Sequence, residues 1–431
     1  MTHRTTRMSG FLEGRVNHMT AETRVLAHSE RVSSPARNTI RLALHCRGKL
    51  DRVLLQRAWE MVGHEVPGLA GTLRLSDGEY VFEPRPDRAG LVAHVEGEQP
   101  DFPLTAHLTL DELDCVAALE TRSTSADDHV VSLLVRHSLA DGKHGLHVLS
   151  RLWELYTEMA EGSAAPALRE PVVAGPLDAA LKERTIPRGT PREFGTGSPA
   201  VYRTGEEWDG QHLSGLNHGC LRLSEEDTKQ LVRRCKAQSL SLHGVLSAAV
   251  ILSLSRSRTD LQAFDLTSVI DVRRHMEPPM HPIEGTTVLG YSTSTVDVTL
   301  HPDVDGIAKL ITENLRIDLE SGAAQESSVV NAGLENPGAV PTMLSNLGVV
   351  PPFPHPDGLV FTDFSAWNEM DLDNPGSPDV LTVYGNMLVA STFGGRLRVD
   401  LFHGNEMFPT GWTAAQVRQI EQILTEYPAQ D

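Results

Sequence analysis

The segment from Arg136 to Gly142 reads Arg-His-Ser-Leu-Ala-Asp-Gly and places a histidine, an aspartate and a glycine at short spacing. An imidazole has an unperturbed pKa of about 6.5, so His137 is suited to accept a proton near neutral pH and return it later. Asp141 has two possible roles: its carboxylate orients the imidazole, or it folds back toward an arginine and holds the turn. Gly142 lacks a Cβ and permits close backbone approach. The segment therefore predicts general-base chemistry.

This segment is expected at the junction of a strand and a helix. Residues 130–135 form a compact apolar run, interrupted by one serine, that is typical of a buried strand. After Gly142, apolar residues recur at helical spacing as far as Gly162. This apolar face consists of Leu146, Leu149, Leu152, Trp153, Tyr156 and Met159. Because side chains at a strand end can point into a cleft, such a junction is a common position for functional groups.

Strand and helix patterns of the same kind occur in both halves of the chain. In the first half they predict a strand at 39–47, a helix at 51–62 and a hairpin around Asp77-Gly78. In the second half the expected elements are helices opened by Ser224 and Ser241, strands at 263–272 and 287–298, a helix at 307–319, a hairpin of 380–390 and 396–402, and a terminal helix capped by Thr413. The sequence thus predicts an α/β protein of the α+β, two-layer type.

These patterns divide the chain into two lobes. We expect residues 1–175 to form an N-terminal lobe that carries the histidine segment, and residues 216–431 to form a C-terminal lobe. The intervening stretch, 176–215, contains many prolines and glycines and shows little periodicity. We interpret it as a crossover linker between the lobes rather than a flexible tether, because its three large aromatic residues would need burial.

Composition excludes several classes of protein. The 431 residues include 38 Lys and Arg against 57 Asp and Glu, a formal net charge of −19, so nucleic acid is not an expected partner. The longest apolar run, 245–254, contains two serines and is shorter than the about 20 residues of a membrane span. No apolar run of signal-peptide length follows the first residues. The four cysteines form no CxxC pair, which favours free thiols and a cytoplasmic location.

The histidine segment resembles the HHxxxDG motif of the condensation-domain superfamily of acyltransferases. This superfamily includes chloramphenicol acetyltransferase, nonribosomal-peptide condensation domains, the plant BAHD enzymes and the polyketide-associated acyltransferases. Three further landmarks follow the order of the family: Gly48-Lys49-Leu50-Asp51, Asp271-Val272-Arg273-Arg274 and Leu344-Ser345-Asn346-Leu347-Gly348. The polyketide-associated branch is the most similar, on the string HSLADGKHG and the chain length. The resemblance covers most of the chain, and 164–215 is the least family-like part.

The resemblance implies two chloramphenicol-acetyltransferase-like lobes that form a V-shaped cleft with a central tunnel. His137 matches the second histidine of the motif and would deprotonate an acceptor hydroxyl or amine as it attacks an acyl thioester. Asp141 would be structural, paired with Arg273 or Arg274. The donor would be acyl-CoA or a phosphopantetheine-bound acyl group on a carrier protein. No covalent enzyme intermediate, further cofactor or metal is implied.

Three residues have roles that the sequence leaves open. Arg136 stands where the family motif has its first histidine, and it either packs in that histidine's place or contacts an anionic part of a substrate. Ser345 and Asn346 either supply an oxyanion donor to the cleft or belong to a turn that links a strand to the loop before Pro351. We include all three as candidate substrate-binding residues.

The predicted function is a thioester-dependent O-acyltransferase that acts on a hydroxyl of a natural-product or polyketide intermediate. Amide formation or cyclisation on the same scaffold is the alternative within this class, and a non-catalytic protein that binds acyl chains or carrier proteins is the alternative outside it. A metal site at His144 and His147 is disfavoured because no third ligand has the right direction. A serine hydrolase is disfavoured because the chain has no Gly-x-Ser-x-Gly sequence.

Overall fold

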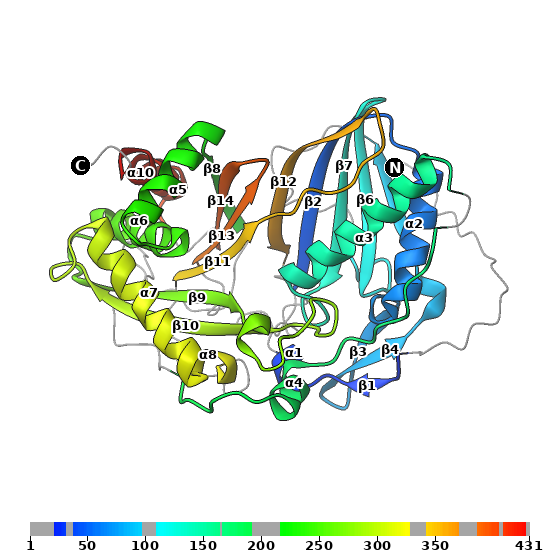
Figure 1. The fold of residues 1–431 in the computed structure, drawn as a ribbon, viewed down its shortest axis with the longest axis horizontal. Helices are drawn as coiled ribbons and strands as arrows, with labels where there is room; N and C mark the ends of the chain where they lie inside the picture. Colours follow the sequence, from blue (N-terminus) through cyan, green and yellow to red (C-terminus); the bar gives the residue numbers. More distant parts are fainter. Residues whose placement is uncertain are drawn as a thin grey trace.

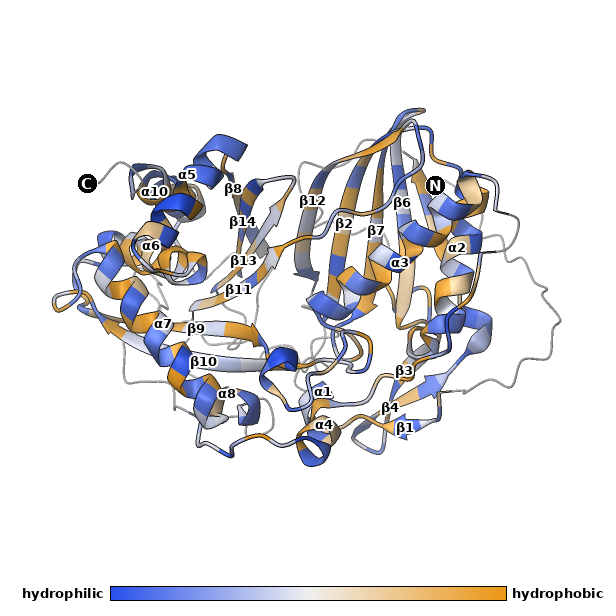
Figure 2. Ribbon diagram, viewed as in Figure 1, coloured by the Kyte–Doolittle hydropathy of each residue, from blue (hydrophilic) through white to orange (hydrophobic). Residues whose placement is uncertain are grey.

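A computed structural model describes eight parts of the chain, and two β-sheets dominate them (Figure 1). The described parts are 21–31, 38–96, 109–163, 166–191, 216–327, 342–369, 386–404 and 408–427. The two sheets lie side by side, and each has helices packed against one face (Figure 1). Apolar and polar residues mix along most strands, as expected for sheets with one face on a helix layer (Figure 2).

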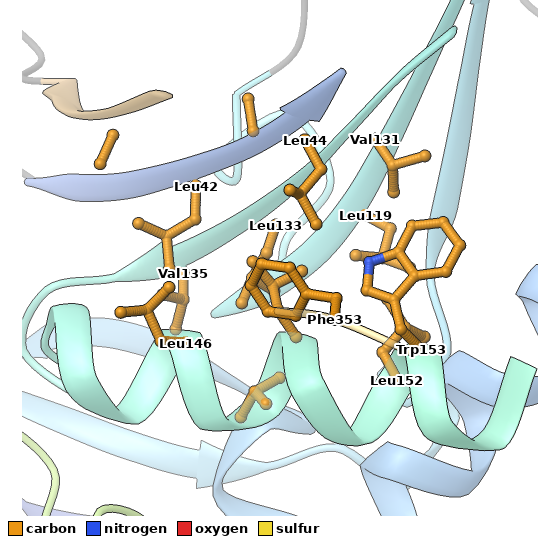
Figure 3. Packing of buried hydrophobic residues seen from close by; sticks show 14 of the residues in the cluster. Leu42, Leu44, Leu119, Val131, Leu133, Val135, Leu146, Leu152, Trp153 and Phe353 are labelled. Carbon is orange, nitrogen blue, oxygen red and sulfur yellow. The ribbon is translucent and has the colours of Figure 1, made fainter. Parts of the chain in front are cut away.

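The N-terminal lobe is built on a five-stranded sheet in the order β12-β2-β7-β6-β5. Its strands are β2 (Thr39–Gly48), β5 (Val92–Glu96), β6 (Ala117–Ser125), β7 (Asp128–Arg136) and β12 (Leu359–Glu369), and its helices are α2 (Arg52–Glu65) and α3 (Gly142–Ala160). Alternate residues of β2, among them Leu42 and Leu44, pack with β7 and with the apolar face of α3 (Figure 3). Asp51 caps α2 by accepting hydrogen bonds from the backbone N–H groups of Val53 and Leu54.

The C-terminal lobe is built on a six-stranded sheet in the order β10-β9-β11-β13-β14-β8. Its strands are β8 (Leu216–Arg222), β9 (Ala263–Asp271), β10 (Leu289–Asp297), β11 (Thr342–Val349), β13 (Asn386–Phe393) and β14 (Arg396–Gly404). Its helices are α5 (Glu225–Ala237), α6 (Leu242–Ser257), α7 (Val304–Ser321), α8 (Ala323–Glu326) and α10 (Trp412–Glu426). Helix α6 is apolar around most of its circumference because it is buried between the sheet and the helices α7 and α10.

Smaller elements join the two lobes at the lower edge of the view in Figure 1. They are β1 (Arg24–Val25), β3 (Gly71–Ser76) and β4 (Glu79–Pro84), which form a three-stranded sheet, and the short helices α1 (His28–Arg31) and α4 (Leu177–Glu183). Three 3-10 turns lie at Pro67–Leu69, Pro86–Arg88 and Arg273–His275. The last of these turns follows β9 directly, so it lies where the C-terminal lobe meets the junction of β7 and α3.

Strand β12 comes from the second half of the sequence but belongs to the sheet of the N-terminal lobe. It pairs antiparallel with β2, from Leu359 opposite Gly48 to Glu369 opposite Thr39. The residues on either side of it in the sequence, β11 and β13, belong to the sheet of the C-terminal lobe. Nothing in the alternation of residues 359–369 identifies which sheet they join, and no strand was predicted for them. The N-terminal sheet is thus completed by residues from far along the chain.

Most elements expected from local patterns are confirmed. The strand at 39–47, the helix at 51–62 and the hairpin around Asp77-Gly78 all form, as do the helices that begin after Ser224 and Ser241. The N-terminal part of the expected strand at 380–390 lies outside the described residues, and so do Phe194, Tyr202 and Trp208 of the expected linker.

The predicted cap of the last helix is wrong. Gly411, with a φ of 82°, occupies the N-cap position of α10, and the helix begins at Trp412. The N-cap residue therefore makes no side-chain hydrogen bond to the helix end. Thr413 lies inside the first turn, where its hydroxyl is 2.6 Å from Nε2 of His403 on β14. The hydroxyl therefore ties the helix to the sheet instead of closing the helix end, a tertiary contact that local sequence does not reveal.

All four cysteines are free thiols, as expected. In the described part of the chain, no single helix is both long and apolar enough to cross a membrane. The helices Glu225–Ala237 and Leu242–Ser257 meet the length and composition criteria only when taken together, and they are bent by 105° at the break between them.

Gly48 gives a test of how tightly β12 is held against β2. Its φ is +116°, and a Cβ placed there would lie 1.9 Å from the carbonyl oxygen of Gly358. Gly48→Ala therefore adds a steric collision to backbone strain, each costing about 1–3 kcal/mol. Gly78, with a φ of +81° and open space around it, is the matched control for strain alone. In urea denaturation we expect Gly48→Ala to lose about 2 kcal/mol more than Gly78→Ala; equal losses would contradict the close approach.

Candidate active site

A cavity lies between the two sheets and takes its walls from both lobes. It encloses about 710 Å³ of empty space, part of which is open to solvent. The N-terminal lobe contributes Ile40, Leu42, His137, Gly142, Lys143, Ala366, Trp367 and Asn368, and the C-terminal lobe contributes Val269, Asp271, Leu289, Tyr291, Met343, Ser345, Asn346, Leu347, Met387 and Val389. Apolar side chains form most of this lining, which is typical of sites that bind small organic molecules. The cavity lies between the lobes, as the sequence led us to expect; the V-shaped outline and the tunnel stay predictions.

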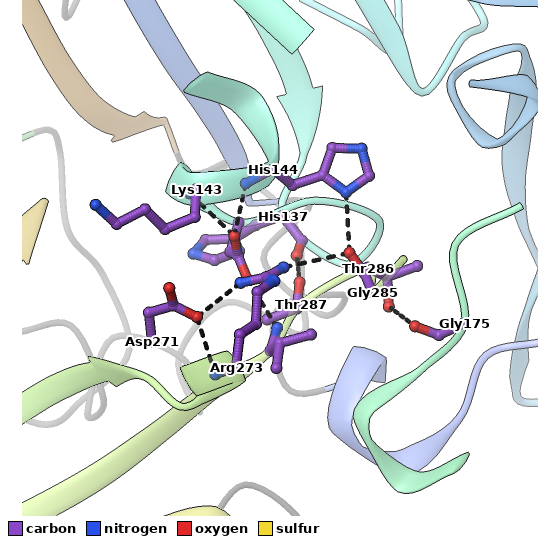
Figure 4. Close-up of polar contacts among 11 residues, drawn as sticks. His137, Lys143, His144, Gly175, Asp271, Arg273, Gly285, Thr286 and Thr287 are labelled. Carbon is purple, nitrogen blue, oxygen red and sulfur yellow. Dashed lines mark hydrogen bonds and ion pairs between the residues drawn. The ribbon is translucent and has the colours of Figure 1, made fainter. Parts of the chain in front are cut away.

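His137 follows directly after β7 and is held by its backbone from two directions. Its N–H donates to the carbonyl oxygen of Asn38, 2.8 Å away, at the start of β2. Its own carbonyl oxygen accepts from the hydroxyl of Thr287, which comes from the C-terminal lobe just before β10 (Figure 4). The position of His137 therefore depends on both lobes, because Asn38 belongs to the N-terminal lobe and Thr287 to the C-terminal lobe.

The imidazole of His137 is only 7% exposed and lines the cavity. Burial lowers its pKa, and the carbonyl groups of His137 and Ala140 and the charge of Asp141 offset this only in part. Among the described residues, its buried Nδ1 has no hydrogen-bond partner within normal geometry. The ring is therefore neutral at neutral pH and able to accept a proton.

Asp141 is fully buried and accepts four hydrogen bonds. Its Oδ1 accepts from the backbone N–H groups of Lys143 and His144, both at 3.0 Å, so Asp141 is the N-cap of α3. Its Oδ2 accepts from Nη1 of Arg273 at 2.7 Å and from the N–H of Val288 at 2.8 Å. None of these bonds comes from the imidazole of His137. Of its two possible roles, the structure shows the one in which Asp141 holds the turn.

The partner of Asp141 is Arg273 and not the neighbouring Arg274. Arg273 is 1% exposed, and its guanidinium also contacts Oδ1 of Asp271 at 3.0 Å and the carbonyl oxygen of Gly285 at 3.3 Å (Figure 4). Arg274 is exposed. Burial would raise the pKa of Asp141, but the charge and hydrogen bond of Arg273, with the N–H groups of His144 and Val288, hold it below its usual value. The carboxylate is therefore ionised at neutral pH.

Gly142 begins α3 in close contact with β11 and has no unusual backbone angle. A Cβ at this position would lie 2.5 Å from Cδ2 of Leu347 on β11. The next residue, Lys143, donates from Nζ to the backbone carbonyl oxygen of Leu347 at 2.6 Å. The first turn of α3 thus contacts β11 through both residues, and the cavity lies beside this contact.

The three residues with open roles fall in two places. Arg136 is 6% exposed, forms an ion pair with Asp111 at 2.7 Å and is not among the residues that line the cavity. This placement differs from the expected contact with substrate and matches the alternative of packing. Ser345 and Asn346 do line the cavity, and they lie within β11 rather than in a turn. Oδ1 of Asn346 accepts from the N–H of Gly348 at 2.8 Å.

The two histidines considered as metal ligands make other contacts. Nδ1 of His144 lies 2.9 Å from the carbonyl oxygen of Gly285. The ring of His147 packs edge-on against His281, with 4.8 Å between ring centres. Within the described ranges, no group of three or more His, Cys, Asp or Glu side chains is placed to hold a metal ion.

Several site residues were not found from the sequence. Thr287, just before β10, Tyr291 on β10 and Trp367 on β12 reach the site from parts of the chain far from the histidine segment, and no local motif marks them. Lys143 lies within the string His-Ser-Leu-Ala-Asp-Gly-Lys that drew attention to the site, so its position was a usable signal. Asp271 likewise belongs to the family-like segment Asp271-Val272-Arg273-Arg274, in which only the arginines had a predicted role.

Comparisons with known proteins show what this chain is similar to. Residues 215–402 match the family model described as phthiocerol/phthiodiolone dimycocerosyl transferase C-terminus. A phthiocerol/phthiodiolone dimycocerosyl transferase of Mycobacterium ulcerans is 25% identical over 371 residues, which cover 82% of this chain and 88% of that protein. The protein of the same name in Mycobacterium tuberculosis strain H37Rv is 25% identical over 402 residues, which cover 86% and 92%.

Solved structures share the fold over nearly the whole chain. Polyketide synthase associated protein 5 from Mycobacterium tuberculosis aligns with a TM-score of 0.76 at 20% identity, covering 96% of this chain and 99% of that one. Trichothecene 15-O-acetyltransferase from Fusarium sporotrichioides aligns with a TM-score of 0.67 at 12% identity, covering 94% and 95%. These likenesses confirm the predicted fold class.

Asp141→Asn tests the buried ion pair. Asparagine keeps the shape but leaves the Arg273 charge buried without its partner, so we expect a loss of about 3–5 kcal/mol in the free energy of unfolding at pH 7. Because folding lowers the pKa of Asp141, its stabilisation is present above the unfolded-state pKa of about 3.9 and is lost as pH falls through the folded value. The gap between wild type and variant should therefore narrow below pH 4 in urea denaturation series.

Asp271→Asn is the matched control, because Asp271 contacts the same guanidinium but its side chain is 23% exposed. We expect it to cost markedly less than Asp141→Asn. Equal losses, or a gap between Asp141→Asn and wild type that does not change with pH, would contradict the role given to the Asp141–Arg273 pair.

Proposed function

We propose that this chain uses His137 as the general base for acyl transfer to a hydroxyl. The chain is a transferase of the condensation-domain type and is related to the polyketide-associated acyltransferases, as its sequence predicted. The observation that carries the proposal is a buried imidazole with a lowered pKa in the wall of an apolar cavity between the lobes. The relatives are named for the transfer of dimycocerosyl groups. For this chain the acceptor we propose is a hydroxyl of a natural-product or polyketide intermediate.

The reaction needs one proton acceptor that later acts as a donor. His137 takes the proton of the acceptor hydroxyl while its oxygen attacks the carbonyl carbon of the acyl thioester. The tetrahedral intermediate then collapses with cleavage of the C–S bond, and the imidazolium returns the proton to the departing thiolate. A ring that is neutral before the reaction is ready for the first step, and its exclusion from bulk water limits loss of the thioester to hydrolysis.

Ser345 and Asn346 are the groups we propose for stabilising the oxyanion of that intermediate. Both lie on β11 and line the cavity that His137 also lines. Because Oδ1 of Asn346 already accepts from Gly348, its amide is fixed with the NH₂ group as the available donor. The serine hydroxyl is a donor of the same kind, one residue earlier on the strand.

The donor we propose is a thioester of coenzyme A or of a carrier protein, and it is a substrate rather than a resident cofactor. A covalent acyl-enzyme is unnecessary, since the acceptor oxygen attacks the thioester directly. The formal charge of −19 supports small-molecule substrates over nucleic acid. We further propose that the reaction takes place in the cytoplasm, where such thioesters are made.

His137→Ala tests the assignment of the base. We expect kcat/KM with acyl-CoA and an alcohol acceptor to fall by about 10²–10⁴-fold, the usual contribution of a general base. Nδ1 of the ring has no hydrogen-bond partner within normal geometry among the described residues, so thermal stability should change little. Release of thiol, followed with a chromogenic disulfide, and the mass of the ester product are the two measurements.

His129→Ala is the matched control, because it removes another buried histidine at the other end of β7. His129 is bonded to Ser123 and Ala126 away from the cavity, so its loss should lower stability and leave kcat/KM of the folded protein near the wild-type value. Unchanged turnover in His137→Ala would overturn the assignment of the base. Absence of turnover in the wild type with both CoA and carrier-protein donors would favour the non-catalytic alternative.

The pH dependence of kcat/KM gives an independent test. Only neutral His137 can accept the proton, and its pKa in the folded protein lies below 6.5. We expect kcat/KM to rise with pH along an acid limb whose midpoint is below 6.5, and to be level from about pH 7 upward. Rates measured from pH 4.5 to 8.5 with a saturating thioester would check this; a midpoint above 6.5 would show that another group controls the rate.

A further inference from the structure

Lys143 brings a positive charge to the end of the cavity where His137 lies. Among the described residues that line the cavity it is the one lysine, and no arginine lines it. Its side chain, that of Asp271 and the imidazole of His137 are directed to the same side of the start of α3 (Figure 4). The proposed mechanism gives Lys143 no task, because proton transfer is assigned to His137 and the fixed turn to Asp141.

The ammonium group is held in place by an irregularity of β11. The pairing of β11 with β13 is regular from Thr342 to Asn346 and resumes at Val349 with a shifted register. Leu347 lies in this interruption, and its carbonyl oxygen accepts from Nζ of Lys143 at 2.6 Å. An ammonium group has three donors, and this is the one hydrogen bond that the described residues provide for it.

The surroundings of Lys143 do not fully compensate its charge. Burial lowers the pKa of Lys143; Asp271 and Asp141 favour the charged form, but Arg274 and Arg273 oppose it. Both carboxylates are already engaged, since Oδ1 of Asp271 and Oδ2 of Asp141 each contact the guanidinium of Arg273. An additional anion beside Lys143 would therefore gain a charge-assisted hydrogen bond to a partly buried ammonium whose charge is only partly compensated.

The rest of the cavity suits an apolar chain. Its side chains from β2, β9, β11, β12 and β13 are largely aliphatic, with one indole: Ile40, Leu42, Val269, Met343, Ala366, Trp367, Met387 and Val389. A ligand that matches both regions has an anionic group at one end and an alkyl or aryl tail at the other. A carboxylate fits the ammonium at the polar end, and the tail fits the apolar walls.

We propose that the acceptor is an amphipathic hydroxy acid, whose carboxylate binds Lys143 while its hydroxyl faces His137. This inference rests on the proposed acyltransferase function and specifies its acceptor. Because Lys143 and His137 lie at the same end of the cavity, the carboxylate and the hydroxyl are only a few atoms apart in the substrate. The hydroxyl oxygen forms the new ester bond, the thioester C–S bond breaks, and the hydroxyl proton passes through His137 to the thiolate. The carboxylate is unchanged in the product, an acyloxy acid.

Calorimetric binding to the resting protein tests the acceptor class without any turnover. The probes are 3-hydroxydecanoate and its methyl ester, which differ in charge but share the hydroxyl and the tail. We expect the wild type to bind the acid at least about 10-fold more tightly than the ester, as a hydrogen bond between charged groups requires. Lys143→Met should reduce this preference to about 2-fold or less. Equal binding of acid and ester by the wild type would overturn the proposal.

Two further variants separate the charge from the position of the side chain. Lys143→Gln removes the charge but keeps a donor for the Leu347 carbonyl, so it should fold normally and lose the preference as Lys143→Met does. Lys182→Met removes an exposed lysine on α4 and should keep the preference of the wild type. A preference retained in both Lys143 variants would show that another group binds the carboxylate, and would equally overturn the proposal.

His137→Ala distinguishes failure of this inference from failure of the proposed function. That variant should keep the preference for the acid over the ester, because it retains Lys143, while turnover is lost. Wild-type turnover of neutral alcohols with no preference for the acid would leave the acyltransferase standing and reject the hydroxy acid. A clear preference for the acid in a protein that transfers no acyl group would reject the enzyme and keep the anion site.

Discussion

The ion pair between Asp141 and Arg273 is the constraint on which the arrangement of the site depends. It joins two residues 132 positions apart in the sequence, one at the start of α3 and one in the turn after β9. Taking both charges out of water is costly, and the cost is offset only because the carboxylate also receives three backbone N–H groups and the guanidinium also meets Asp271 and Gly285. Such a pair tolerates little displacement, so it fixes one lobe against the other at the position of His137.

Burial around the Asp141–Arg273 pair also affects the protonation of the groups that line the cavity. The same burial that requires Asp141 to be paired removes His137 from bulk water and partly buries Lys143, and it lowers the pKa of both. For the imidazole this gives a base that is neutral at the pH of the reaction. For the ammonium it leaves a positive charge that an anionic ligand would neutralise. The turn between β7 and α3 thus carries a structural carboxylate, a base and a cation within seven residues.

Local sequence predicts much of the fold and only the part of the site that is local. The strand that became β2, the helix expected at 51–62 and the apolar face of α3 depend on neighbours within a few residues, so their patterns were sufficient. Arg273 and Arg274 are adjacent in one short turn, and only the direction of that turn decides which of them meets Asp141. The ion pair of Arg136 with Asp111 and the assignment of β12 to the N-terminal sheet are tertiary outcomes as well.

The pairing of β12 with β2 explains why neither lobe alone can form the site. This strand follows β11 in the sequence and pairs with β2, so it places Ala366 and Trp367 in the cavity wall opposite β13. Near the middle of the same strand, Asp363 lies 3.2 Å from Nη1 of Arg398 on β14 and 3.3 Å from Nη2 of Arg222 on β8. The two lobes are therefore joined by one contact at Asp141 and by another at Asp363. A change in the spacing of the lobes would disturb both contacts at once, and the alignment of His137 with a bound thioester would be lost with them.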